Sequence, residues 1–175
     1  SSVRFVGSAT IGVDHIDQIY LRQEGIRFAY APGCNAAAVV QYVFSALCKL
    51  CPDWELKTVG IVGCGNVGNL LRKKLLALNV SCRVYDPFLS SIEGSELDNL
   101  NLVAQCDIVT VHTPLTLDGP HPTAKMIDQK VINEMKEGAL LINAGRGEVI
   151  DSEALLERLK FGKSLKVALD VWESE

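Results

Sequence analysis

The chain has 175 residues, which is long enough for one complete domain and part of a second. Apolar residues make up 48% of it and charged residues 22%, a balance that is typical of a globular protein and not of a disordered one. The formal net charge is −4, and this acidic balance without a basic cluster argues against a nucleic-acid partner.

The first 35 residues are predicted to form two strands and one helix. Strands are indicated at 3–9 and 26–32, and a helix at 15–25 is closed by Gly25. A longer helix follows, with Asn35 as its N-cap and Pro52 as its stop. Because two strands and one helix are too few for a core, we interpret residues 1–35 as part of a domain and 36–56 as an interdomain helix and linker. We therefore expect the chain to be a piece of a longer protein.

Short apolar runs and helical segments alternate regularly from residue 57 to residue 175. Strands are predicted at 58–63, 82–86, 107–112, 139–144 and 165–170, and helices at 66–79, 97–106, 128–135 and 151–160. Strands that are apolar on both faces need helices on both sides. The fold class predicted for 57–175 is therefore α/β, with a Rossmann-type doubly wound parallel sheet.

A glycine motif lies between the first strand and the first helix of this region. Gly63, Gly65 and Gly68 stand in G-x-G-x-x-G order, in the context in which that motif binds a dinucleotide. Gly63 permits a tight turn, Gly65 lets backbone approach a pyrophosphate, and Gly68 lets helix and strand pack closely. The helix start, with Asn66 and Val67, supplies N–H groups to the phosphates. The alternative is a tight turn that binds no ligand.

Asp86 ends the next strand, about 20 residues after the motif, where the adenine-side ribose lies in such folds. A carboxylate there accepts hydrogen bonds from ribose hydroxyls and would repel a 2′-phosphate by several kcal/mol at ~4 Å. The segment 87–94 contains no Lys or Arg to neutralise such a phosphate. We therefore predict NAD and not NADP as the cofactor. The alternative is a carboxylate that caps the turn before Pro87.

Two further strand ends carry candidate site residues. Thr113 follows the strand at 107–112 and is expected to contact the cofactor, whereas His112 is interpreted as a structural histidine. Arg146 stands between Gly145 and Gly147, where the chain leaves a buried strand. Its position there indicates that it binds an anion at the edge of the sheet. The alternative is a surface arginine in a strand-to-helix loop.

The six cysteines, at positions 34, 48, 51, 64, 82 and 106, lie in or beside apolar segments. They are expected to be reduced thiols of a cytoplasmic protein. Cys48 and Cys51 form a C-x-x-C pair, but no second pair completes a zinc site, so we expect helix-end packing and no metal. No signal peptide is indicated, and the apolar stretch 35–50 is shorter than a membrane span.

Together these motifs resemble those of the NAD-dependent D-2-hydroxyacid dehydrogenases. The resemblance depends on VGIVGCGNVG (59–68), HTPL (112–115), INAGRGEVID (142–151) and VALDVWESE (167–175). Three longer stretches, 5–17, 31–48 and 112–128, narrow it to a member that acts on a small-molecule 2-hydroxy acid phosphate. The resemblance covers the whole chain. It implies that residues 1–35 are part of a second, flavodoxin-like substrate domain and that 57–175 bind NAD.

The resemblance also implies roles for single residues. Arg146 would be the catalytic arginine, binding the substrate carboxylate and polarising the oxygen that is oxidised. Glu175 would orient a catalytic histidine expected beyond residue 175. Thr10 would bind substrate, although a turn-forming role is an equal alternative. Ala144, Gly145 and Arg146 would form the loop that touches the cofactor, and Asp170 would contact its nicotinamide side.

The leading hypothesis is an oxidoreductase that transfers a hydride from the 2-hydroxy acid to NAD. The alternatives are another D-2-hydroxyacid dehydrogenase, such as a phosphoglycerate type, and an NAD-sensing binding module. We expect residues 1–175 alone to bind NAD weakly and to show no turnover. The resemblance further implies a homodimer built around the helix that begins at Asn35, although core packing explains the same apolar side chains: Val39, Val40, Val43, Phe44 and Leu47.

Overall fold

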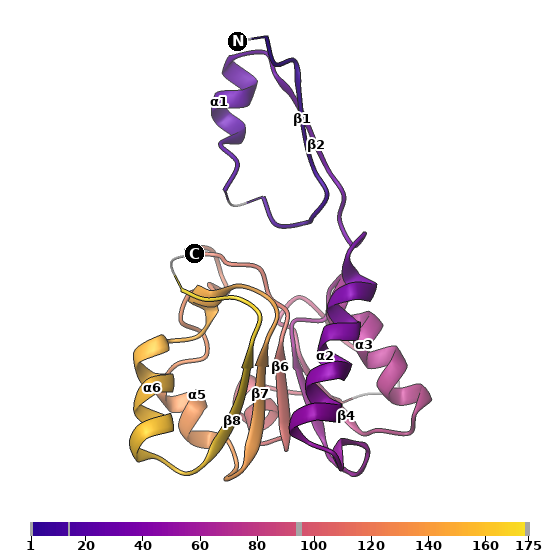
Figure 1. Ribbon diagram of the computed structural model, residues 1–175, viewed down its shortest axis with the longest axis vertical. Helices are drawn as coiled ribbons and strands as arrows, with labels where there is room; N and C mark the ends of the chain where they lie inside the picture. The colour runs from indigo at the N-terminus through magenta and orange to yellow at the C-terminus, as the bar shows by residue number, and fades with distance from the viewer. Residues whose placement is uncertain (1, 14, 94–95, 174–175) are drawn as a thin grey trace.

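The computed structural model describes residues 2–13, 15–93 and 96–173, which contain two separate sheets (Figure 1). β1 (Phe5–Ser8) and β2 (Arg27–Tyr30) form a parallel pair connected through α1 (Gln18–Gln23). This small unit extends away from the rest of the chain, and none of the described residues before Ala36 is buried. The loop after β1 forms the end of the unit that faces the larger sheet.

The larger sheet has six parallel strands in the order β5-β4-β3-β6-β7-β8. They are β3 (Val59–Val62), β4 (Cys82–Tyr85), β5 (Glu96–Leu97), β6 (Ile108–Val111), β7 (Ala139–Asn143) and β8 (Leu165–Leu169). The chain begins at the centre, moves outward to β5, and then returns to continue from β6 on the other side. This order places a topological switch point between β3 and β6 and confirms the predicted Rossmann-type doubly wound sheet.

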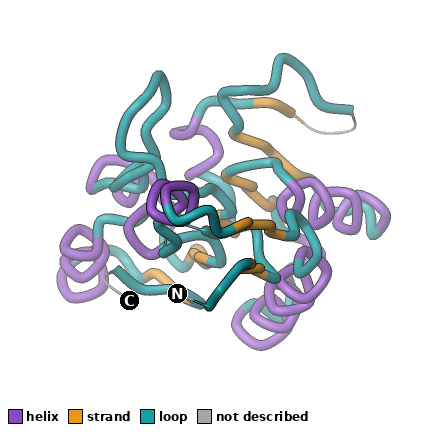
Figure 2. The backbone as a smooth tube through the Cα atoms, turned by 90° about the horizontal axis from the view of Figure 1, so that it is seen from above, coloured by secondary structure: helices purple, strands orange, loops and turns teal. Residues whose placement is uncertain are grey.

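Helices cover both faces of this sheet (Figures 1 and 2). α2 (Ala36–Leu50) and α3 (Asn66–Ala77) pack on one face, where Ile61, Leu71 and Leu75 are fully buried. α4 (Leu100–Ala104), α5 (Gln129–Glu134) and α6 (Ser152–Phe161) cover the other face, around Val109 and Leu141. The central strands are buried on both sides, which is why their sequences are continuously apolar.

The core uses most of the apolar face of α2. Val40, Val43 and Leu47 are buried in the cluster that also holds the β3 side chains. Val39 and Phe44 are half-buried, and the Phe44 ring packs edge-on against Trp54 with centroids 5.5 Å apart. Packing within the chain therefore explains these residues without a second protomer.

The structure differs from the sequence prediction at several element ends. The predicted helix at 97–106 begins at Leu100, because Leu97 belongs to β5 and pairs with Val84, while the Asn99 side chain caps the helix. Asn35 occupies the N-cap position of α2 but makes no side-chain capping bond. Two short 3₁₀ helices were not predicted: η1 (Trp54–Leu56) and η2 (Gly147–Val149).

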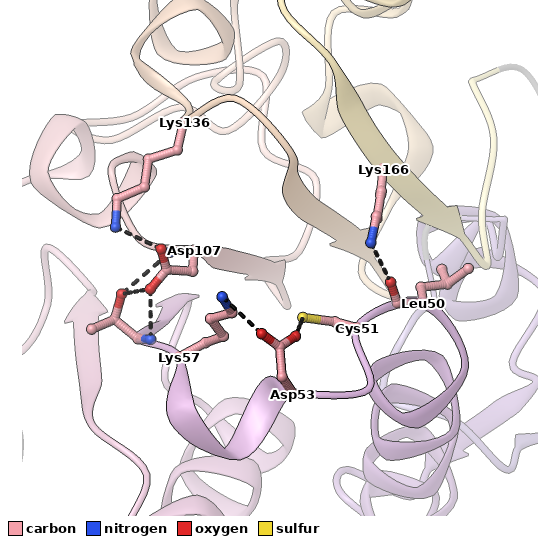
Figure 3. A network of polar contacts seen from close by, with 8 residues as sticks. Leu50, Cys51, Asp53, Lys57, Asp107, Lys136 and Lys166 are labelled. Atoms are coloured by element: carbon pink, nitrogen blue, oxygen red, sulfur yellow. Dashed lines mark hydrogen bonds and ion pairs between the residues drawn. The ribbon is translucent and has the colours of Figure 1, made fainter.

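Asp107 connects the amino ends of β3 and β6 to the loop before β7, at the edge of the sheet shown in Figure 3. Its Oδ2 accepts hydrogen bonds from Thr58 N at 2.9 Å and Thr58 Oγ1 at 2.7 Å, and Oδ1 pairs with Lys136 Nζ at 2.7 Å. Burial raises the pKa of Asp107, but the bonds from Lys136 and Thr58 outweigh it and hold the pKa at about 2. The carboxylate therefore stabilises the fold while it is ionised.

We expect Asp107→Asn to lower the free energy of unfolding by about 1–2 kcal/mol at pH 7, after allowance for solvent screening. Because its folded pKa lies below the unfolded value of about 3.9, the contribution is present above pH ~4 and is lost as the pH falls toward 2. Urea unfolding at pH 7 and pH 3 measures this. Asp53→Asn, at an exposed ion pair with Lys57, is the control with a smaller effect. A gap that stays constant between the two pH values would contradict the assignment.

Candidate functional site

A pocket of about 750 Å³ lies at the carboxyl ends of the six-stranded sheet. The loops that follow β3, β4, β6, β7 and β8 form one side of it, and the loop after β1 closes it from the small unit. Ligands of parallel α/β sheets bind at this edge. The predicted site residues that line the pocket are Thr10, Gly63, Gly65, Asn66, Val67, Asp86, Thr113, Ala144, Gly145 and Arg146.

The three glycines of the motif differ in what surrounds them. Gly63 has a φ of +86°, and a Cβ added there would lie 2.8 Å from Thr113 Cγ2. A Cβ on Gly68 would lie 2.0 Å from the Gly63 carbonyl oxygen, so helix and turn are in direct backbone contact. Gly65 has open space around it, with no atom within 4 Å of an added Cβ. The turn is thus packed tightly on the protein side and open on the pocket side.

Asp86 lines the pocket and also holds the turn around it. Its Oδ2 accepts a hydrogen bond from Cys64 N at 2.9 Å, and its Oδ1 accepts one from Phe88 N at 3.1 Å. Asp86 therefore does cap the turn, as the alternative interpretation of the sequence expected. Since a carboxylate offers about four acceptor positions, two remain for the hydroxyls of a ribose.

His112 and Thr113 leave two buried polar atoms on the pocket wall without partners. Among the described residues, His112 Nδ1 and Thr113 Oγ1 make no hydrogen bond. His112 Nε2 lies 2.9 Å from Thr110 Oγ1, and desolvation lowers the pKa of His112 to about 4, so the ring is neutral at pH 7. The contact with Thr110 accounts for one ring nitrogen, as a structural role requires, but Nδ1 has no partner among the described residues, so that role stays a prediction. Unpaired buried polar atoms of this kind are expected where a bound ligand completes the hydrogen bonding.

The loop that carries Arg146 is fixed by backbone contacts. Asn143 Oδ1 accepts from Gly145 N at 3.1 Å, and Asn143 Nδ2 donates to Arg146 O at 2.9 Å. A Cβ on Gly145 would lie 2.8 Å from Thr113 O, and one on Gly147 would lie 2.0 Å from Trp172 O. The two glycines therefore allow the loop to fit between the chain segments that follow β6 and β8.

The Arg146 side chain reaches from this loop to the small unit. Its Nη1 donates a hydrogen bond to Gly145 O at 2.8 Å. Its Nη2 lies so close to Gly12 that a Cβ built there would be 1.6 Å away. The guanidinium thus lies between the sheet edge and the loop after β1, within the pocket.

Three other predicted residues are not seen in the pocket lining: two lie elsewhere in the structure, and one lies outside the described residues. Gly68 is buried under the turn. Asp170 is exposed at the end of β8; its N–H donates to Asn143 O at 2.9 Å, and after burial its charge is the second cause that raises the pKa of Tyr42. Asp170 does not line the pocket. Glu175 lies outside the described residues, so its catalytic role stays a prediction.

Thr10 lines the pocket, but its hydroxyl is engaged within its own loop. Thr10 Oγ1 donates to Gly12 O at 3.0 Å and lies 3.0 Å from Ser8 Oγ. This is the turn-forming arrangement that the sequence left open. The hydroxyl proton used on Gly12 is not available to an anionic ligand in this conformation.

Sequence reasoning missed Asn143, Gly12 and the Phe88–His121 pair. Asn143 is a buried amide at the end of an apolar strand, and that contrast was a usable signal. Gly12 gave no signal, because its contact with Arg146 joins two units far apart in the sequence. Phe88 and His121 line the pocket and pack edge-on with ring centroids 5.4 Å apart, but they come from separate loops.

The described residues offer neither a metal centre nor a membrane span. Within the part of the chain that the structure describes, no group of three or more His, Cys, Asp or Glu side chains is arranged to hold a metal ion. Over the same residues, no helix has the length and apolar character needed to cross a bilayer. All six cysteines are described, and each is a free thiol.

The parallel sheet, the open glycine turn, the acidic residue after β4 and the arginine after β7 define an NAD-binding domain of 2-hydroxyacid dehydrogenase type. Residues 44–175 match the family model "D-isomer specific 2-hydroxyacid dehydrogenase, NAD binding domain", and the chain belongs to this family. The match confirms the prediction that the cofactor is NAD.

Curated relatives with the name of one dehydrogenase match over the length of the chain. The chain is 48% identical over 175 residues to erythronate-4-phosphate dehydrogenase of Cellvibrio japonicus, with 100% of the chain and 46% of that protein covered. It is 51% identical over 181 residues to the protein of that name from Pectobacterium atrosepticum, covering 100% and 48%. The chain thus spans about half the length of the curated relatives it matches.

Solved structures of the family share the fold. The D-lactate dehydrogenase of Aquifex aeolicus, solved with NAD and lactic acid, matches with a TM-score of 0.84 and 25% identity, over 98% of this chain and 58% of that one. A D-2-hydroxyisocaproate dehydrogenase matches with a TM-score of 0.81 and 25% identity, over 97% and 58%. These matches extend over both sheets of the chain described above.

Proposed function

We propose that this chain acts within an erythronate-4-phosphate dehydrogenase. The reaction oxidises the C2 hydroxyl of 4-phospho-D-erythronate with NAD, giving the 2-oxo acid and NADH in pyridoxal phosphate (vitamin B6) biosynthesis. The observation that supports it best is that Arg146 lines the same pocket as the open glycine turn. Relatives of that name are 47–51% identical over essentially the whole chain.

The residues of the pocket fit NAD. Gly65 leaves room for the pyrophosphate, Asp86 keeps acceptor positions for ribose hydroxyls, and His112 Nδ1 and Thr113 Oγ1 need partners. When bound, the nicotinamide ring supplies the hydride acceptor. Ala144 and Gly145 line the pocket and are proposed as further contacts around the ring. The contact predicted for Asp170 stays a proposal, because Asp170 itself is not part of the lining but directly precedes Val171, which is.

Arg146 is the residue of this chain that binds the substrate. Its planar guanidinium binds a carboxylate through paired charge-assisted hydrogen bonds and stabilises the developing 2-oxo group. We propose that Glu175 orients a histidine that takes the hydroxyl proton, which keeps the proton path separate from the hydride path. Arg146 then fixes which face of C2 meets the cofactor.

We also propose the domain organisation, cellular location and oligomeric state of the protein. Residues 1–35 belong to a substrate domain, 36–56 to the interdomain helix and linker, and 57–175 to the NAD-binding domain, with α2 sharing the core of the last. The six free thiols support a cytoplasmic, reducing location. The resemblance to the family implies a homodimer around α2, which we keep as a proposal, although Phe44 already packs against Trp54 within the chain.

The assay that tests this function mixes the purified full-length protein with NAD and 4-phospho-D-erythronate and follows NADH absorbance. We expect NADH formation with that acid to exceed the rate with 3-phospho-D-glycerate or D-lactate. A clear preference for 3-phosphoglycerate would instead assign another member of the family. An absence of NADH with every 2-hydroxy acid, together with tight NAD binding, would favour an NAD-sensing module.

We expect Asp86→Asn to reduce the preference for NAD over NADP about 30-fold, measured as the ratio of kcat/KM values. The substitution removes the charge that repels a 2′-phosphate, a loss equivalent to about 2 kcal/mol. Asp118→Asn is the control, because Asp118 also lines the pocket but lies on the loop after β6. An equal change in both variants would assign selectivity to the general field of the pocket and not to Asp86.

A further inference from the structure

Gly12 of the small unit lies against Arg146 of the larger domain within the pocket. An added Cβ would be 1.6 Å from Arg146 Nη2, 2.7 Å from Cζ and 3.3 Å from Nη1, so the flat guanidinium lies directly over the bare backbone. The φ of Gly12 is outside the left-handed region, so its backbone conformation is open to any residue. What requires glycine at position 12 is therefore the space that Arg146 occupies.

The loop around Gly12 is held by its own hydrogen bonds. Thr10 Oγ1 donates to Gly12 O, Ser8 Oγ lies 3.0 Å from Thr10 Oγ1, and Thr10 N donates to Ser8 Oγ at 3.4 Å. Cys34 Sγ, after β2, donates to Ala9 O at 2.7 Å. These bonds hold the Gly12 backbone in its position against Arg146.

We propose that Gly12 is a positioning residue that holds the Arg146 guanidinium at the site of the substrate carboxylate, with Thr10 as the residue that holds Gly12 in place. This inference rests on the proposed function of Arg146. Arg146 comes from the larger domain, whereas Gly12 comes from the small unit. The orientation of the guanidinium therefore depends on both units being in contact.

The space at position 12 is too small for any side chain, so a substitution there should lower the reaction rate. A methyl group at position 12 cannot coexist with the observed guanidinium, which must move by more than 1 Å to restore van der Waals contact. Misplacement of a substrate-positioning group by about 1 Å costs on the order of 100-fold in rate. We expect the glycine turn to be unaffected, because the three atoms nearest the added Cβ all belong to Arg146 and none belongs to the turn.

We expect Gly12→Ala in the full-length enzyme to lower kcat/KM for the 2-hydroxy acid about 100-fold while the Kd for NAD changes less than threefold. Gly7→Ala is the matched control in the same unit, because its Cβ would meet only the exposed Phe5 ring, at 3.1 Å. Thr10→Val should give a smaller loss than Gly12→Ala, and Thr10→Ser, which keeps the hydroxyl, should restore activity.

A double-mutant cycle distinguishes positioning from damage to the fold. The glutamine of Arg146→Gln is too short to reach position 12, so adding Gly12→Ala to it should change kcat/KM less than threefold. A full 100-fold further loss would show that Gly12→Ala acts through misfolding and would overturn the proposal. Unchanged activity of Gly12→Ala in the presence of Arg146 would overturn it equally. If Arg146→Gln alone keeps full activity, the proposed function of Arg146 fails first.

Discussion

Replacing Arg146 by lysine is expected to lower kcat/KM for the 2-hydroxy acid about 1000-fold. Lysine keeps the charge but loses the planar pair of donors, and hydrogen bonds to charged groups contribute about 1.5–3 kcal/mol each. Two such bonds correspond to about 4 kcal/mol, or three orders of magnitude in rate. Steady-state kinetics on the full-length enzyme measure the loss, which should fall on kcat as well as KM because the bonds strengthen as the 2-oxo group forms.

The binding of NAD provides the internal control for this substitution. Arg146 side-chain atoms contact Gly145 and Gly12, and neither contact involves the glycine turn. The Kd for NAD should therefore change less than threefold. Arg27→Lys, at an exposed position in β2, should behave as the unmodified protein does. Retention of kcat/KM within tenfold in Arg146→Lys would remove Arg146 from the carboxylate site.

The parts of the site that the sequence could predict are those encoded in consecutive residues. The glycine turn, Asp86 and Thr113 each lie within two residues of a strand end, and all parallel strands end at the same edge, so the motif order alone places them together. Arg146 was predictable for the same reason. The choice of NAD over NADP followed from the Asp86 carboxylate together with the absence of Lys and Arg in residues 87–94.

The parts that could not be predicted depend on contacts through space. Gly12 and Arg146 are separated by most of the chain, and no local pattern indicates that one occupies the space above the other. β5 has only Glu96 and Leu97, too short to show a strand period, so its Leu97 was assigned to the helix that follows. The role of Asp86 as a turn cap was open because ligand binding and capping use the same carboxylate.

The neighbouring glycines of the turn should separate folding from cofactor binding. We expect Gly68→Ala to lower the free energy of unfolding by about 3 kcal/mol, because its Cβ would stand 2.0 Å from the Gly63 carbonyl oxygen and backbone cannot yield cheaply. α3 must move away from β3 to admit the methyl group. NAD affinity falls with it, since the turn is displaced. Urea unfolding without cofactor measures the loss.

Gly65→Ala is the matched variant in the same turn. With no atom within 4 Å of its Cβ, it should unfold within about 0.5 kcal/mol of the unmodified protein, yet bind NAD at least 30-fold more weakly because the methyl group enters the space for the pyrophosphate. Isothermal titration with NAD tests the second half. If Gly65→Ala binds NAD normally, the pyrophosphate does not lie on this turn. If Gly68→Ala unfolds normally, the tight contact with Gly63 does not limit stability.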